Sequence, residues 1–115
     1  MSGFLNPIGG GGGGGGNCSM QTGTYTGDGN DDRSINIGVN LAAKTYAYVI
    51  IKGNLGVGAV HRFEYGQGDL TMKYSSAADV ADAIQAFTAT GFQIGTVTEV
   101  NNNGSTYRYI AFWVD

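Results

Sequence analysis

The chain has few of the residues on which site chemistry usually depends. Its 115 residues include one cysteine, one histidine and one proline. A single cysteine, Cys18, excludes an internal disulfide and leaves an inert thiol, an interchain bridge or a reactive group. The inert thiol is favoured, because a reactive cysteine needs a nearby cation and none is close in sequence. The histidine, His61, lies inside an expected strand, and we interpret it as a half-exposed strand residue rather than a catalytic or metal-binding group.

Charge is scarce as well. Charged residues make up 13% of the chain and the net charge is −3, whereas soluble domains average about 25% charged residues. Phosphate binding needs clustered Lys and Arg, and the six basic residues here are scattered, which argues against nucleic acid as a partner. The first residues carry neither a basic group nor an apolar stretch as long as a signal peptide or membrane helix. We therefore expect extensive contact with other proteins, no membrane partner and no export by the general secretory route.

An acidic loop has the oxygen-rich composition that calcium prefers. Asp28, Asp31 and Asp32 are set among glycine and asparagine. Their spacing departs from that of an EF-hand loop, and Arg33 adjoins them. A solvated turn in which Arg33 pairs locally is therefore favoured over a metal site.

A second glycine-containing segment lacks the features of a nucleotide-binding loop. Gly53, Gly56 and Gly58 are followed neither by a Lys-Ser/Thr pair nor by the start of a helix. With no catalytic or metal-binding constellation elsewhere, we expect a chain that is not an enzyme and needs no cofactor.

Glycine, in contrast, is abundant, with 21 residues. A run of consecutive glycines follows a short apolar head, and glycine backbone becomes ordered only when other backbone approaches it closely. We predict that residues 1–16 form an extended glycine-rich arm that anchors the chain in an assembly and packs against other chains at a three-fold axis. The predicted anchoring residues are Phe4, Leu5, Ile8, Gly9, Gly10, Gly11, Gly12, Gly13, Gly14, Gly15 and Gly16.

Residues 17–115 have the pattern of a single β-domain, because β-branched and aromatic residues recur with a period of two. Turn signals separate the strands, among them a Gly-Gln-Gly turn and an Asn-Gly turn that each predict a hairpin. The pattern predicts an all-β, antiparallel β-sandwich of jelly-roll or Ig-like type. The expected strands are 21–26, 34–39, 46–52, 61–65, 70–74, 92–100 and 106–114.

One segment, 75–87, departs from this pattern. It is rich in alanine, and Val80, Ile84 and Phe87 stand at helical spacing. Short apolar runs do not distinguish helix from strand. We predict a helix up to about Asp82 and a strand after it.

The last expected strand, 106–114, is apolar on both sides. A strand of this kind is covered on both faces, so one face packs the core and the other meets a second layer or a neighbouring chain. A central sandwich strand with an aromatic flank explains the pattern equally well. We predict a homotrimer whose subunit contact lies near Tyr107, Tyr109 or Trp113.

Four segments carry a resemblance to a known group of proteins. They are 22–37 (TGTYTGDGNDDRSINI), 48–52 (YVIIK), 88–95 (TATGFQIG) and 102–113, which contains Thr-Tyr and Ala-Phe-Trp. Together they resemble a β-rich module found in the tail, fibre and capsid-surface components of tailed bacteriophages. The resemblance implies a virion structural protein, commonly oligomeric, of capsid-decoration, head-fibre or tail-fibre type. Such a protein is made in the host cytoplasm, and its partners are its own copies and other virion proteins.

A second hypothesis comes from the aromatic residues themselves. Tyrosine and tryptophan presented on sandwich strands or loops can stack on sugar rings, and Asp or Asn can bond their hydroxyls. On this interpretation the domain is an adhesion module that recognises glycans of the host surface.

Overall fold

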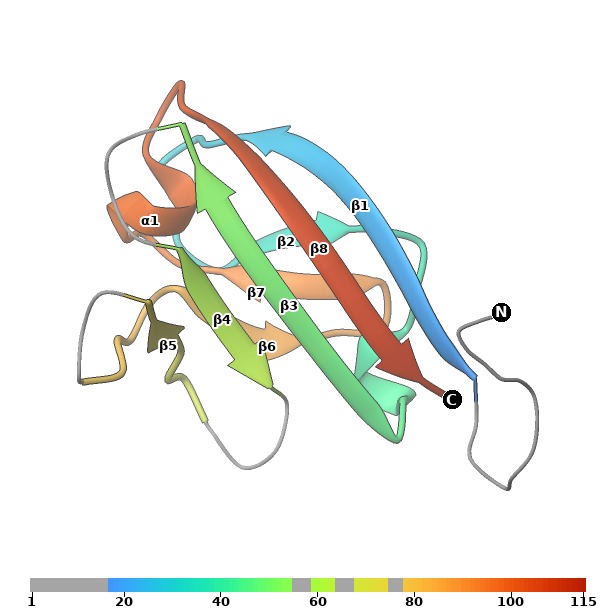
Figure 1. The fold of residues 1–115 in the computed structure, drawn as a ribbon. Helices are drawn as coiled ribbons and strands as arrows, with labels where there is room; N and C mark the ends of the chain where they lie inside the picture. The colour runs from blue at the N-terminus through green and yellow to red at the C-terminus, as the bar shows by residue number, and fades with distance from the viewer. Residues whose placement is uncertain (1–16, 55–58, 64–67, 75–77) are drawn as a thin grey trace.

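The computed structural model describes residues 17–54, 59–63, 68–74 and 78–115 (Figure 1). The predicted arm, with Phe4, Leu5, Ile8 and the glycine run, lies outside the described residues. The described chain forms eight strands, β1 to β8, one 3-10 turn, η1, and one short helix, α1. Their bounds are β1 Cys18–Thr26, β2 Arg33–Asn36, η1 Leu41–Ala43, β3 Tyr46–Gly53, β4 Val60–Phe63, β5 Met72–Lys73, β6 Ile84–Phe87, β7 Gly91–Ile94, α1 Thr98–Asn101 and β8 Thr106–Val114.

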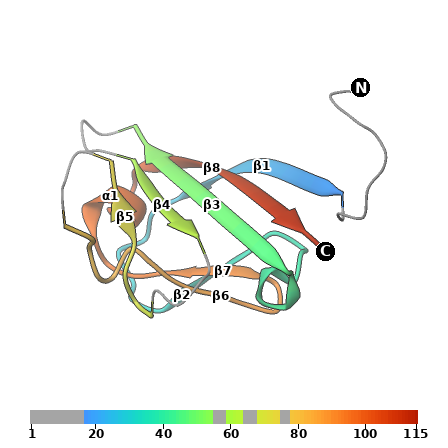
Figure 2. The same ribbon diagram turned by 60° about the horizontal axis from the view of Figure 1, so that its bottom comes forward.

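The strands form two antiparallel sheets. The larger has the order β1-β8-β3-β4-β5 and the smaller the order β2-β7-β6. Figure 2 shows the two sheets as separate layers, one above the other. The predicted all-β antiparallel class is confirmed. Most of the predicted strands are present, and β4 and β5 pair as the predicted hairpin.

The core lies between the two layers and follows from the period of two. On β3, Ala47, Val49 and Ile51 are buried while the residues between them are not, and β8 alternates in the same way. The smaller sheet contributes Phe92, whose ring meets the edge of Tyr109 at a centroid distance of 5.6 Å. Burial of these apolar side chains is the main force that holds the sheets together.

Close approach between the strands of the smaller sheet requires a glycine. A Cβ placed on Gly91 would lie 2.2 Å from the backbone oxygen of Ile35, closer than real Cβ atoms come. Gly91 therefore lets β7 approach β2 along its full length.

Two predictions were wrong. Residues 78–82 contain no helix, because Val80 instead exchanges backbone hydrogen bonds of 2.8 and 2.9 Å with Thr71 and Asp82 takes a positive φ of 59°. The expected hairpin about the Asn-Gly turn does not form either. β7 ends at Ile94 in the smaller sheet, and the chain passes through α1 before it enters β8 in the larger one. The strand predicted after Asp82 is present as β6.

Candidate assembly surface

The three residues predicted near a subunit contact lie on the inner side of β8. Tyr107 and Tyr109 are buried in the core, and Trp113 is partly buried against it. The side chains of Tyr107 and Tyr109 are therefore directed into the domain, whereas Trp113 keeps part of its surface exposed. The subunit contact near these residues stays a prediction.

Two tyrosines instead tie the larger sheet to α1 and the loop after it. The Tyr107 hydroxyl donates to the Thr98 carbonyl at 2.5 Å and accepts from the Asn102 backbone N–H at 2.8 Å. Tyr25 stacks on Tyr107 at 5.3 Å and donates to the Val100 carbonyl at 2.8 Å. Burial, together with the neighbouring Tyr107, raises the pKa of Tyr25 far above its usual range. Both hydroxyls donate to carbonyls of α1 and act as structural groups.

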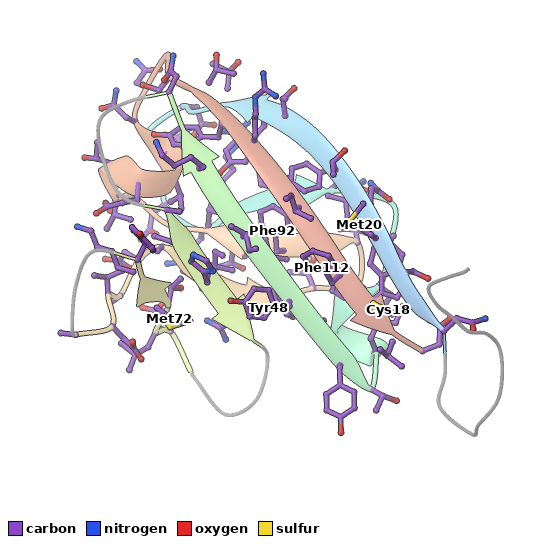
Figure 3. All side chains as sticks on the ribbon, viewed as in Figure 1. Cys18, Met20, Tyr48, Met72, Phe92 and Phe112 are labelled. Atoms are coloured by element: carbon purple, nitrogen blue, oxygen red, sulfur yellow. The ribbon has the colours of Figure 1, made fainter. Side chains whose placement is uncertain are left out.

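The opposite side of the larger sheet, which we call the outer face, is turned away from the smaller sheet. The register of β1, β8 and β3 places Met20, Phe112 and Tyr48 in one row across the three strands, as Figure 3 shows. The next row joins Thr22 to Ile110 and Ile50. The residues of the outer face with described side chains are Cys18, Met20, Thr22, Thr24, Thr26, Tyr46, Tyr48, Ile50, Lys52, His61, Met72, Thr106, Arg108, Ile110, Phe112 and Val114.

Apolar side chains dominate the middle and one end of this outer face. Met20, Tyr46 and Met72 are 62%, 52% and 47% exposed. Tyr48 and Phe112 contact each other edge to face at 6.5 Å, and both are partly exposed. An antiparallel sheet with one solvated face normally carries polar residues there. A contiguous apolar patch on such a face indicates a surface that another molecule covers.

The other end of the outer face is positively charged. Lys52 and Arg108 are register partners on β3 and β8, and both are exposed. Beside them is a hollow of about 440 Å³ whose lining includes Thr22, Thr24 and Ile50. The outer face is therefore polar and basic at one end and apolar over the rest.

His61 sits on the same outer face and has a partner. Its Nδ1 lies 2.9 Å from the hydroxyl of Tyr48, which belongs to the neighbouring strand β3. Burial raises the pKa of the Tyr48 hydroxyl. His61 is half-buried, in agreement with the interpretation of it as a strand residue.

The acidic loop is held by Arg33 and by a buried asparagine. The Arg33 guanidinium lies 3.4 Å from the Asp28 carboxylate, which confirms the predicted local pair. A backbone N–H of Asn30 donates to Asp28 and, with Arg33 and Asn101, holds the pKa of Asp28 below its usual value. Asn101 is fully buried and donates to the carbonyls of Asn30 and Gly95. Asp28, Asp31 and Asp32 are exposed, and within the described residues no three His, Cys, Asp or Glu side chains gather as metal ligands would.

Sequence reasoning found one strand of the outer face and missed its extent. The expectation that both sides of 106–114 are apolar is met, because Ile110, Phe112 and Val114 share the outer side of β8. The contributions of β1 and β3 were missed, although Met20 and Ile50 alternate with inward residues in the same way. That alternation was a usable signal, but the order of the strands was not known.

Comparisons of the chain with protein-family models, with curated proteins and with solved structures found no match. Within the described residues, no helix has the length and apolar character needed to span a membrane.

Proposed function

We propose that the chain is a non-enzymatic structural component of a phage particle, of capsid-decoration, head-fibre or tail-fibre type, which assembles through the outer face of its larger sheet. The observation that carries the proposal is the apolar outer face itself, on which Met20 and Met72 are about half exposed or more. A virion protein surrounded by copies and neighbours has a reason for such a face, whereas a free monomer does not. The resemblance to tailed-phage modules supplies the particular setting.

The arm and the fold type belong to the same proposal. The two sheets are of jelly-roll or Ig-like sandwich type, and residues 1–16 precede them as a glycine-rich anchor that joins three copies. Low charge and a single exposed thiol, Cys18, suit a surface that lies against other proteins. The partners are copies of the chain and other virion proteins.

The test is location and stoichiometry. Particles purified from a lysate of the infected host should contain the chain in many copies, and an image reconstruction should place it at symmetric positions. Ile110→Asp, in the apolar part of the outer face, should lower its copy number several-fold. Thr106→Asp, an exposed change at the end of the same strand, is the matched control and should not. Absence from the particles, or equal incorporation of both variants, would contradict the proposal.

Glycan binding is the second candidate, and the hollow beside Ile50 favours it. Thr22, Thr24 and Arg108 supply hydrogen-bonding groups around an apolar floor, a combination that suits a sugar ring. Tyr107 and Tyr109 are buried and are not available for stacking on a sugar. A glycan array should show binding that Arg108→Ala abolishes, and a blank array with the folded chain would reject the candidate.

A further inference from the structure

Four strand edges bound the two sheets, and three of them carry devices that prevent pairing with another chain. β5 is two residues long and ends in Lys73. β2 has four residues and begins with Arg33, and β6 has four residues and a bulge between Ile84 and Ala86. Short edges, charged side chains and bulges are the usual means by which natural sheets avoid association through their edges.

The fourth edge, β1, has none of these devices. It is nine residues long, CSMQTGTYT, with no charged residue and no proline. Its register with β8 runs from Cys18 opposite Val114 to Thr26 opposite Thr106 without a bulge. No other described strand lies along its outer edge, which Figure 1 shows at the border of the larger sheet.

The hydrogen-bond pattern shows which backbone groups of β1 face outward. The Thr106 carbonyl accepts from Asn54 on the β3 side, so Thr106 directs its backbone groups away from β1. Its partner Thr26 directs its own away from β8, and the Arg33 side chain caps the Thr26 carbonyl at 2.7 Å. Hydrogen-bonded and non-hydrogen-bonded pairs alternate in an antiparallel ladder. Every second residue of β1, counted back from Thr26, therefore turns its backbone N–H and C=O away from β8. The outward-facing residues before this capped end are Cys18, Met20, Thr22 and Thr24.

We propose that β1 pairs with β1 of a second copy across a two-fold axis, so that the two larger sheets become one continuous sheet. In the described chain β1 offers the long unprotected edge, and the matching edge on an identical chain is β1 itself. No like charges meet, because the strand carries none. Such a contact is isologous and closes on itself, so it satisfies both edges without forming a fibre.

The cap on Thr26 fixes the expected register. The Thr26 carbonyl is already bonded to Arg33, which leaves the backbone groups of Cys18, Met20, Thr22 and Thr24 to pair. All four residues find an outward-facing partner on the second copy when Met20 lies opposite Thr22. Cys18 then lies opposite Thr24. The two outer faces come to the same side of the joined sheet, so the pairing doubles the apolar surface. β1 pairs in this way whether or not the chain belongs to a phage particle, and a three-fold contact through the arm is compatible with it.

The first experiment measures mass and amide exchange on the full chain. Sedimentation should give an even number of 11.9 kDa chains. Thr22→Lys and Thr22→Pro should each halve that mass, because the first places a charge on the edge and the second removes an outward N–H without touching the ladder to β8. Thr106→Lys makes the same change on the outer face of β8, which lies between β1 and β3 and is not an edge strand. It should leave the mass unchanged. In the wild type the amides of Met20 and Thr22 should exchange as slowly as that of Gly23, and Thr22→Lys should speed the exchange of the Met20 amide while that of Gly23, which faces β8, stays slow.

The second experiment reads the register by disulfide formation. Residues opposite each other in a hydrogen-bonded pair are about 5.5 Å apart at Cα, within the range a disulfide spans. Thr24→Cys should therefore cross-link to the native Cys18 of the second copy under mild oxidation. Thr106→Cys, also exposed and also in the presence of Cys18, should not. A monomeric wild type at high micromolar concentration, a mass unaffected by both Thr22 variants, or equal cross-linking of both cysteine variants would overturn the proposal.

Discussion

The two sides of the larger sheet are built from the same strands and have opposite roles. On β3, Ile50 and Ile51 are neighbours in sequence, yet Ile51 is fully buried in the core while Ile50 faces outward beside the hollow. On β8, Tyr107 points inward and bonds to the backbone of α1, whereas Ile110 points outward. Apolar character alone therefore does not say what a residue does in this domain. The inner side stabilises the fold, and the outer side is available to a partner.

The largest expected effect separates the two sides by one residue position. Ile51→Ala should lower the free energy of unfolding by about 2–5 kcal/mol, because it leaves a cavity between two packed layers. Ile50→Ala, the same change on the outer face, should cost about 1 kcal/mol or less in the isolated chain. Chemical denaturation of both variants measures the difference. Equal losses in the free energy of unfolding would mean that Ile50 contributes to the stability of the isolated chain as much as Ile51 does.

The second effect concerns the polar anchor on the inner side. Tyr107→Phe keeps the ring but removes the hydroxyl that bonds Thr98 and Asn102. The Thr98 carbonyl and the Asn102 N–H, in part-buried hydrogen bonds, then lose this partner, so stability should fall by about 1 kcal/mol.

The matched control for this change is Tyr74→Phe, at a residue that is 79% exposed and that should change stability little. If thermal unfolding shows no difference between the two variants, the Tyr107 hydroxyl does not anchor α1 to the sheet.

A third effect depends on pH and concerns Glu99 of α1, which forms an ion pair with Lys73 of β5. Burial opposes ionisation of this carboxyl, but its bonds to Lys73 and to backbone hold its pKa below the usual value. Because the pKa of Glu99 is lower in the folded state, the stability that its ionised carboxylate contributes is fully present at neutral pH. That stability is lost as the pH falls below the unfolded-state pKa of about 4.3 toward the folded-state pKa.

Glu99→Gln should therefore destabilise the chain by about 1 kcal/mol at pH 7, and the difference from wild type should shrink at pH 3. Denaturation curves at the two pH values measure it. Asp69→Asn, at an exposed carboxylate, is the matched control and should change stability little at pH 7. A difference for Glu99→Gln that stays constant with pH would show that the ion pair does not contribute.

The sequence was a good guide to long strands and a poor guide to their partners. β1, β3 and β8 alternate over eight or nine residues, a signal strong enough to locate them, although the strand predicted over 21–26 begins at Cys18. The Asn-Gly turn was also located correctly, and Gly104 takes the positive φ of 84° that such a turn requires. A turn does not determine which strand comes before it, however. The chain enters β8 from α1, and α1 is too short for a sequence period to reveal.

The candidate surface was half predictable for a related reason. Both sides of β8 are apolar, so local pattern could not say which side packs inward. The choice depends on Tyr107 and Tyr25, whose hydroxyls reach carbonyls on and near α1, up to 75 positions away in the chain. Contacts of that range are properties of the fold and not of any window of sequence.

The smallest effect on stability is the most informative one for the outer face. Ile110→Thr replaces a half-buried apolar residue by another β-branched one, so strand propensity is kept and the isolated chain should lose no more than about 0.5 kcal/mol. Its solubility should rise, and its incorporation into an assembly should fall, because the changed side chain lies at the centre of the row from Thr22 to Ile50. Thermal unfolding measures the stability of the variant, and the copy number in purified particles measures its incorporation.

Val49→Thr, an inward change on β3, is the opposite case. It should destabilise the chain strongly, since it buries a hydroxyl in the core. A loss of stability for Ile110→Thr as large as that for Val49→Thr would remove the distinction between the two sides on which the proposed surface depends.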